Sequence, residues 1–222
     1  MATTGFPYGG HMIIVFGGIK GGSGKTTLAT NICQMRASAG FKVLLIDSDD
    51  QKSAYDWSLV REGSDLKPSF PTICLGGIYL HKTILKMKAD YDDIIIDAGG
   101  RDTTSQRSAL SCADKLIVPF KPRSLDVWTR GAVKSLVADY VSANPKLKTY
   151  SVINQSDPKG KDNEVSIEVL DECDLIKRIP ILIGNRKSFC NAAADGMGVN
   201  ELKIKDDKAC SELKILYDHI YA

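Results

Sequence analysis

Short apolar runs alternate along the chain with stretches in which apolar residues recur at helical spacing. Runs of this length are typical of strands in a parallel sheet, which are buried on both faces because helices cover both sides. The alternation predicts successive βαβ units, and hence one α/β domain with a mostly parallel, twisted sheet and helices on both faces. The predicted strands are residues 13–16, 43–46, 94–96, 116–120, 150–153 and 179–183, with a further short strand near 72–75.

Two of the other stretches predict helices that place one face on the core. Between residues 125 and 141, apolar residues recur three or four positions apart, with charged residues on the other faces. The tail from 206 to 222 has a similar stripe, but its other positions include more acidic than basic residues. A membrane-binding helix has a basic polar face instead, so the tail is expected to pack on its own core. Its stripe consists of Ala209, Leu213, Leu216, Tyr217 and Ile220.

The length and composition are those of one ordinary globular domain. The 222 residues are 43% hydrophobic and 25% charged, and no apolar run approaches the roughly 18 residues of a membrane span. We therefore expect a cytoplasmic protein. The six cysteines include no Cys-x-x-Cys pair that would indicate a metal, cluster or redox site, so we expect reduced and mostly buried thiols.

Residues 1–11 differ from the rest of the chain. They are rich in Gly, Thr and Pro and show no periodicity. Such a segment is typical of a tag or of a short disordered tail. The folded domain is expected to span residues 12–222.

The most specific chemical motif follows the first predicted strand. Glycines in a phosphate-binding loop let successive backbone N–H groups surround a phosphate, a lysine bridges the β- and γ-phosphates, and a hydroxyl binds Mg²⁺. Lys25 and Thr26 fill the last two places. A helix from about Thr26 adds the positive end of its dipole to the site. The other residues of the loop are Lys20, Gly21, Gly22, Ser23, Gly24 and Thr27.

The loop carries one lysine more than phosphate binding needs. Ile19 stands where the usual motif has a glycine, and Lys20 opens the sequence Lys-Gly-Gly-Ser-Gly-Lys-Thr-Thr. This deviant form resembles the loop of the ParA/MinD superfamily of ATPases. The resemblance implies a P-loop fold, ATP and Mg²⁺ as ligands, and an ATP-dependent homodimer. It also implies that Lys20 acts in catalysis, by reaching across a nucleotide sandwich to the partner subunit's phosphates.

Two predicted strands end in acids, at the edge of the sheet where parallel sheets bind their ligands. Residues 94–97 read Ile-Ile-Ile-Asp, a Walker B pattern, so we expect Asp97 to hold Mg²⁺ through a water molecule. The glycines that follow, Gly99 and Gly100, are expected to form a switch that moves when the γ-phosphate leaves.

The second acidic strand end resembles another motif of the same family. Residues 47–51 read Asp-Ser-Asp-Asp-Gln, and the family motif is Asp-x-Asp-Pro-Gln. The resemblance implies that Asp47 is the catalytic residue that positions the attacking water, with Asp49 and Gln51 as switch residues. Asp50 replaces the family's proline, so we expect a looser switch.

Weaker similarities to the family continue toward the carboxyl terminus. Residues 121–126 resemble the loop after the next strand, and Asn154 matches an asparagine on the adenine side, where its amide can both donate and accept hydrogen bonds. Pro180 is a further nucleotide-binding candidate. It lies in a segment whose sequence resembles the corresponding segment of the small partition ATPases. Residues 97–102 depart from the Asp-Thr-Pro-Pro of longer members, which also carry an amino-terminal helix-turn-helix domain. The similarity is therefore to the short, plasmid-type branch, and sequence-specific DNA recognition is expected of a partner.

Together these features favour an ATPase of DNA partition that acts on the nucleoid and not on a membrane. It would dimerise with ATP, bind DNA without sequence preference, and hydrolyse ATP when stimulated by a centromere-binding or adaptor protein. The net charge of the chain is only +2, which is low for a protein that binds nucleic acid. The alternative to DNA contact is that the basic residues near the carboxyl terminus lie on an ordinary solvated face. The candidates for DNA contact are Arg186, Lys187, Lys203, Lys205 and Lys208.

Three other functions remain open on the sequence. A nucleoid-based ATPase that positions a protein cargo would use the same motifs. A ligase resembling dethiobiotin synthetase would share the fold but has no use for Lys20. A module that binds ATP without hydrolysing it is disfavoured by Asp47.

Overall fold

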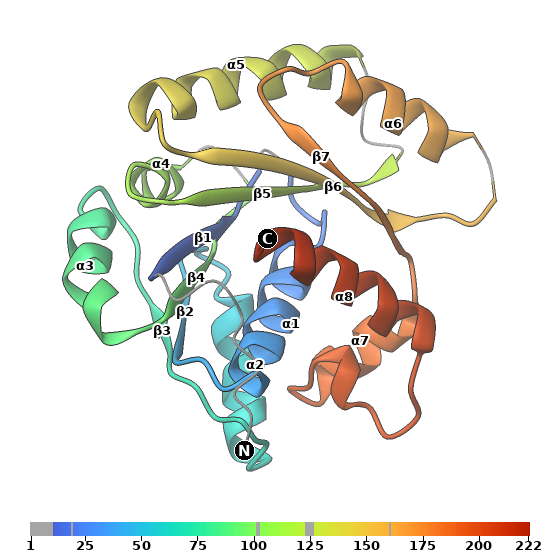
Figure 1. Cartoon of the computed structure of the whole chain (residues 1–222). Helices are drawn as coiled ribbons and strands as arrows, with labels where there is room; N and C mark the ends of the chain where they lie inside the picture. Colours follow the sequence, from blue (N-terminus) through green and yellow to red (C-terminus); the bar gives the residue numbers. More distant parts are fainter. Residues whose placement is uncertain (1–10, 19, 101–102, 123–126, 160) are drawn as a thin grey trace.

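A seven-stranded parallel sheet forms the centre of the computed structural model, which describes residues 11–18, 20–100, 103–122, 127–159 and 161–222. Within these residues the strand order is β3-β2-β4-β1-β5-β6-β7, and every neighbouring pair is parallel (Figure 1). The strands are β1 (Met12–Phe16), β2 (Val43–Asp47), β3 (Thr72–Cys74), β4 (Asp93–Asp97), β5 (Lys115–Phe120), β6 (Lys148–Ser156) and β7 (Lys177–Gly184).

Helices cover both faces of this sheet (Figure 1). One face packs against α1 (Lys25–Ser38), α2 (Ser53–Gly63), α7 (Lys187–Ala194), α8 (Asp207–Ile220) and the short 3₁₀ helix η3 (Val199–Glu201). The other face packs against α3 (Leu80–Met87), α4 (Thr104–Leu110), α5 (Val127–Ala143) and α6 (Asp162–Asp171), with the 3₁₀ helix η1 (Lys88–Asp90) directly after α3.

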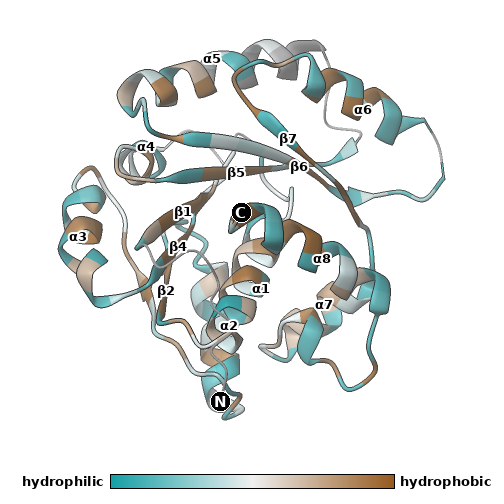
Figure 2. Cartoon of the chain, viewed as in Figure 1, coloured by the Kyte–Doolittle hydropathy of each residue, from teal (hydrophilic) through white to brown (hydrophobic). Residues whose placement is uncertain are grey.

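The alternation of side chains along β1 explains why the sheet has a core on each face. Ile14 and Phe16 belong to the cluster under α1, whereas Ile13 and Val15 belong to the cluster on the opposite face, and none of the four is exposed. Figure 2 shows β1, β2 and β4 mainly in brown, hydrophobic colours, and mixed colours on β5, β6, β7 and the outer helices. The central position of β1, between β4 and β5, places the loop that follows it beside the ends of both neighbours.

The predicted fold class is confirmed, and so are the predicted elements. All six apolar runs lie in strands, and the short segment near residue 73 is β3. The stretch 125–141 corresponds to α5, although most side chains in its first half lie outside the described residues. In α8 the five residues of the predicted stripe are the buried ones, so this helix packs on its own domain.

The expectation for the cysteines is partly wrong. All six thiols are free, but only Cys33 is buried, and Cys74 and Cys190 are exposed. Short strands and short helices near the surface place these thiols at the periphery. Among the described residues no helix has the length and apolar character to cross a bilayer. Residues 1–10 are not described, so the expectation of a tag or tail falls outside the structure.

Candidate functional site

The glycine-rich loop joins β1 to α1, and side chains at the end of β6 donate hydrogen bonds to it. Gly22 and Gly24 adopt φ angles of +72° and +90°, which favour glycine. A Cβ atom on Gly24 would lie 2.1 Å from Nδ2 of Asn154, so no larger residue fits there. Asn154 Nδ2 donates to the carbonyl of Ser23 at 2.7 Å, and Gln155 Nε2 donates to the carbonyl of Gly22 at 3.1 Å.

Lys25 lies inside this loop, whereas Lys20 lies on its outer edge. The Lys25 side chain is buried, and its Nζ donates to the backbone carbonyl of Lys20 at 3.3 Å. Burial lowers the pKa of Lys25, and the nearby carboxylates of Asp97 and Asp49 oppose this effect. No acidic residue occupies the first turn of α1, so the loop combines an ammonium group with an uncompensated helix amino terminus. The loop is therefore built to bind an anion.

Asp97 and Thr26 form the part of the site that fits a divalent cation. Thr26 Oγ1 donates to Asp97 Oδ2 at 2.6 Å, while the buried Asp97 Oδ1 has no hydrogen-bond partner. Burial raises the pKa of Asp97 to about 7; the charge of Asp47 adds to the rise, and the Thr26 hydrogen bond and Lys25 oppose it. A hydroxyl and a carboxylate are hard oxygen ligands, which Mg²⁺ prefers. The pair thus fits the metal that a nucleotide would bring.

Replacing Asp97 with asparagine is expected to stabilise the nucleotide-free protein clearly more at pH 8 than at pH 5. Because the folded-state pKa of about 7 lies above the ordinary 3.8, folding is penalised as pH rises through this interval. The full penalty, reached above pH 7, is on the order of 4 kcal/mol. Thermal unfolding without nucleotide measures it, with Asp139→Asn, an exposed change on α5, as the control. Equal shifts at both pH values would contradict the assignment.

The structure does not bring Asp47 to the cleft, contrary to the sequence prediction. Its carboxylate is buried and accepts backbone N–H bonds from Ala54 at 2.8 Å and Tyr55 at 2.9 Å, at the amino terminus of α2. Its other oxygen accepts from the N–H of Asp49 at 3.0 Å. Burial raises the pKa of Asp47, and these hydrogen bonds oppose the rise. Both oxygens are thus used in holding the start of α2.

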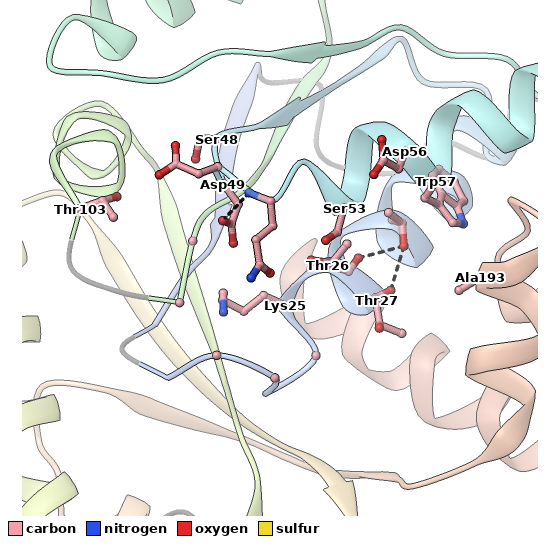
Figure 3. Close-up of a pocket in the computed structure, with 18 of the residues that line it drawn as sticks. Lys25, Thr26, Thr27, Ser48, Asp49, Ser53, Asp56, Trp57, Thr103 and Ala193 are labelled. Carbon is pink, nitrogen blue, oxygen red and sulfur yellow. Dashed lines mark hydrogen bonds between the residues drawn. The ribbon is translucent and has the colours of Figure 1, made fainter.

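Asp49 lines the cleft together with Asp50, and the Asp49 carboxylate is the one whose charge acts on Lys25 (Figure 3). Its Oδ1 accepts from the N–H of Gln51 at 3.1 Å, and its carbonyl accepts from the N–H of Lys52 at 3.1 Å. The turn therefore closes although Asp50 replaces the family's proline. Lys52 completes it with a φ of +54°, an unfavourable value for a residue with a side chain.

The glycines after β4 lie directly against the other two segments. A Cβ atom on Gly100 would lie 2.8 Å from the backbone of Gly21, and one on Gly99 would lie 3.5 Å from the Asp49 carboxylate. The loop after β1, the turn after β2 and the segment after β4 thus meet at the carboxyl edge of the sheet. Movement in any of them would displace the others.

The cleft that these segments line is larger than a single nucleotide pocket. Its volume is about 1700 Å³, whereas small-molecule pockets are typically about 300–1,000 Å³. Figure 3 shows Lys25 and Asp49 toward one side of the view and Trp57 and Ala193 toward the other. The cleft therefore extends from the glycine-rich loop to α2 and α7.

The remaining predicted residues are more scattered. Asn154 is buried under the loop and does not line the cleft, whereas its neighbour Gln155 does. Pro180 is exposed within β7 and is not on the cleft. Residues 101–102 and 123–126, which carried part of the family comparison, lie outside the described residues.

The five basic candidates do not form one uniform group. Arg186 forms a two-point ion pair with Glu212, with its shorter contact at 2.5 Å. Lys205 donates to the backbone carbonyl of Asn200. Lys187, Lys203, Lys205 and Lys208 are all exposed, so the structure leaves these four on the surface and Arg186 in a structural role.

Comparison with known proteins agrees with this geometry. Residues 14–199 match the CobQ/CobB/MinD/ParA nucleotide binding domain. The chain belongs to this family. It is a ParA/MinD family ATPase with a nucleotide-binding domain, and its other similarities fall within the same group.

Among curated proteins, the chain is 24% identical to the maintenance of carboxysome distribution protein A of Halothiobacillus neapolitanus, over 91% of this chain and 93% of that protein. It is 26% identical to a protein ParA of Rhizobium radiobacter, over 64% of this chain and 63% of the relative. The name of the first relative refers to carboxysomes, and the name of the second refers to no cargo.

Solved structures show the same fold at low identity. A putative plasmid partition protein of Borrelia burgdorferi bound to AMPPNP matches with a TM-score of 0.68 and 20% identity, covering 94% of this chain and 98% of that one. Apo McdA of Cyanothece matches with a TM-score of 0.72 and 18% identity, covering 92% and 99%. MinD of Aquifex aeolicus matches with a TM-score of 0.70 and 21% identity, covering 94% and 96%.

Sequence reasoning missed one supporting residue entirely. Gln106 on α4 has no exposed surface; its Oε1 accepts from the N–H of Gly18 at 3.1 Å, and its Nε2 donates to the hydroxyl of Tyr140 at 2.7 Å. It supports the start of the glycine-rich loop from 88 positions away. A single glutamine in a short helix gives no sequence signal for such a role.

Proposed function

We propose that this protein is an ATP-hydrolysing switch that dimerises with ATP and then binds DNA without sequence preference, in order to partition a plasmid or chromosome. The observation that carries the proposal is the placement of the two lysines. Lys25 supplies the ammonium group inside the loop, and we assign Lys20, whose side chain is exposed and lines the cleft, to a second copy's nucleotide. Two ammonium groups on one γ-phosphate would repel each other.

In the proposed reaction, the loop and Lys25 hold the β- and γ-phosphates in place. Asp49 accepts a hydrogen bond from a water molecule and directs its oxygen at the γ-phosphorus. A bond forms from the water oxygen to that phosphorus as the bond from the phosphorus to the bridging oxygen breaks, and the water's proton passes by way of Asp49 to the released phosphate, giving ADP and phosphate. Mg²⁺, held next to Thr26 and Asp97, would neutralise phosphate charge. Lys20 of the partner copy would stabilise the charge that develops on the leaving oxygen, as an arginine finger does.

We give Asp49 the role that the sequence prediction gave to Asp47, because its carboxylate lines the cleft and its charge acts on Lys25. A Cβ atom on Gly99 would reach van der Waals distance of this carboxylate, and Gln51 lies in the same turn. Loss of the γ-phosphate would thus change the conformation of the turn after β2 and of the segment after β4 together. The protein is proposed to act in the cytoplasm on the nucleoid, with a centromere-binding or adaptor protein that stimulates hydrolysis.

A second candidate is positioning of a protein cargo on the nucleoid. The similarity to the carboxysome distribution protein A favours it, since that similarity extends over 91% of the chain. Both candidates use DNA as the track, so both require ATP-dependent DNA binding.

ATP turnover measured with and without random-sequence duplex DNA tests the proposal. A DNA-based switch should show slow turnover that DNA increases. A ligase of related fold would be indifferent to DNA and would need a small carboxylate substrate. Turnover that DNA leaves unchanged, together with no DNA binding in ATP, would reject both the partition and the cargo-positioning candidates.

The salt dependence of DNA binding is expected to depend on the four exposed lysines. Four in each subunit allow up to eight phosphate contacts in a dimer, which corresponds to a slope of log affinity against log salt of at most about −7. Lys208→Ala should reduce the slope by about two, one for each subunit, and weaken all sequences alike. Lys86→Ala, an exposed change on α3, is the control. Fluorescence anisotropy measures both, and an unchanged slope for Lys208→Ala would remove this lysine from the contact surface.

A further inference from the structure

Ile204 is a large apolar side chain that the fold leaves in solvent. It is 89% exposed, the highest value among the exposed large hydrophobic residues of the described chain, where the next is Tyr79 at 66%. A fully exposed isoleucine forgoes the favourable free energy that burial would provide, typically about 1.5–3 kcal/mol. Isolated exposed apolar residues are common, so the surroundings of Ile204 decide whether it belongs to a binding surface.

The segment that carries Ile204 is anchored on both sides. Before it, Glu201 accepts from the N–H of Gly198 at 2.7 Å and pairs with both terminal nitrogens of Arg61, at 2.8 and 2.9 Å. After it, Asp206 caps α8 by accepting from the N–H of Ala209 at 3.1 Å, and it accepts from the Ser188 hydroxyl at 2.7 Å. These contacts hold Ile204 at the tip of a fixed loop.

Exposed lysines stand on both sides of Ile204 in the sequence. Lys203 and Lys205 flank it in sequence, and Lys187 and Lys208 belong to the same carboxyl-terminal region. The acids nearby compensate them only in part. The Asp206 carboxylate is used in the cap and the Ser188 contact, which leaves Asp207 as the exposed acid next to the loop. The loop therefore presents one apolar group between positive charges.

We propose that Ile204 enters the minor groove of duplex DNA while Lys203 and Lys205 contact phosphates on either side of it. The inference rests on the proposed DNA binding and names the residue that makes an uncharged contact. Proteins that bind the minor groove insert single apolar side chains against or between base pairs, and one isoleucine suffices for this. Binding to a lipid surface instead needs the apolar face of a whole amphipathic helix, and the apolar face of α8 is buried.

The test compares Ile204→Ser with the unchanged protein in Mg-ATP, using random-sequence duplex DNA and fluorescence anisotropy. Affinity should fall at least about tenfold, because each subunit of the dimer loses most of the transfer free energy of one apolar side chain. The salt slope should not change, because no charge is removed. Ile204→Leu should retain most of the affinity. Val165→Ser, which removes an apolar side chain that is 50% exposed on α6, should have no effect.

Two outcomes of this test and one further measurement distinguish the ways in which the inference could fail. If the unchanged protein binds DNA with ATP and Ile204→Ser binds equally well, the inference is wrong and the proposed function stands. If neither protein binds DNA, both are wrong. Flotation with phosphatidylserine vesicles provides the lipid arm: binding that Ile204→Ser loses, with unchanged DNA affinity, would assign the tip to a membrane and overturn the inference.

Discussion

Lys25→Ala is expected to abolish nucleotide binding, whereas Lys20→Ala is expected to bind ADP as the unchanged protein does. Lys25 Nζ is buried inside the glycine-rich loop and already contacts a backbone oxygen there, so its removal takes away the ammonium group that faces the phosphates. Losing one member of a buried charge pair costs about 2–5 kcal/mol, which corresponds to a loss of affinity of about 30- to 5,000-fold. Binding of a fluorescent ADP analogue measures the contrast.

The Lys20→Ala protein should fail at a later step. Lys20 lies on the exposed edge of the loop and serves, in this proposal, the nucleotide of the other subunit. Turnover should fall by roughly 10²–10³-fold, the value of one electrostatic donor to a transition state. Dimerisation in ATP should be lost as well. A Lys20→Ala protein that dimerises and turns over normally would show that this lysine is an ordinary surface residue.

Asp49→Ala is expected to bind ATP and accumulate as a dimer that hydrolyses ATP at least about 10²-fold more slowly. The carboxylate lines the cleft and makes no hydrogen bond to the glycine-rich loop among the described contacts, so its removal affects the attacking water and leaves the loop intact. Single-turnover hydrolysis measures the effect. Asp49→Asn, which keeps the shape of the side chain, should be nearly as slow because the amide is a poor proton acceptor.

Asp47→Ala should have a different defect. Its oxygens accept the N–H groups of Ala54 and Tyr55 at the start of α2, so the change removes a helix cap from a buried position. Loss of such a cap costs about 1–2 kcal/mol of stability. We therefore expect a lower melting temperature with and without nucleotide, and a smaller effect on single-turnover hydrolysis than Asp49→Ala has. The reverse ranking would return the catalytic role to Asp47.

The contrast between these two acids shows what the sequence can and cannot predict. Apolar runs predicted the strands and the fold class, because a strand that is buried on both faces needs consecutive apolar residues. The glycine-rich motif located the loop, because its glycines are required by the backbone itself. The direction of the side chain of the last residue in a strand cannot be predicted in this way. Asp47 ends β2, and the turn that follows points its carboxylate at α2 and not at the cleft.

Long-range hydrogen bonds explain the other differences. Asn154 was expected at the adenine, but its amide donates to Ser23, more than a hundred positions earlier in the chain. Arg186 was expected on DNA, but Glu212 pairs with it from α8. Neither partner is suggested by local sequence, because both contacts arise only when the sheet and its covering helices are assembled.

The most direct test of the central claim is the molecular mass of the Asp49→Ala protein, measured by light scattering in Mg-ATP and in Mg-ADP. The claim is that a second copy completes the nucleotide site, so ATP should give twice the mass of one chain and ADP should give the mass of one chain. Adding Lys20→Ala to the same protein should restore the single mass in ATP. A single chain in ATP, or the same mass in both nucleotides, would contradict the account.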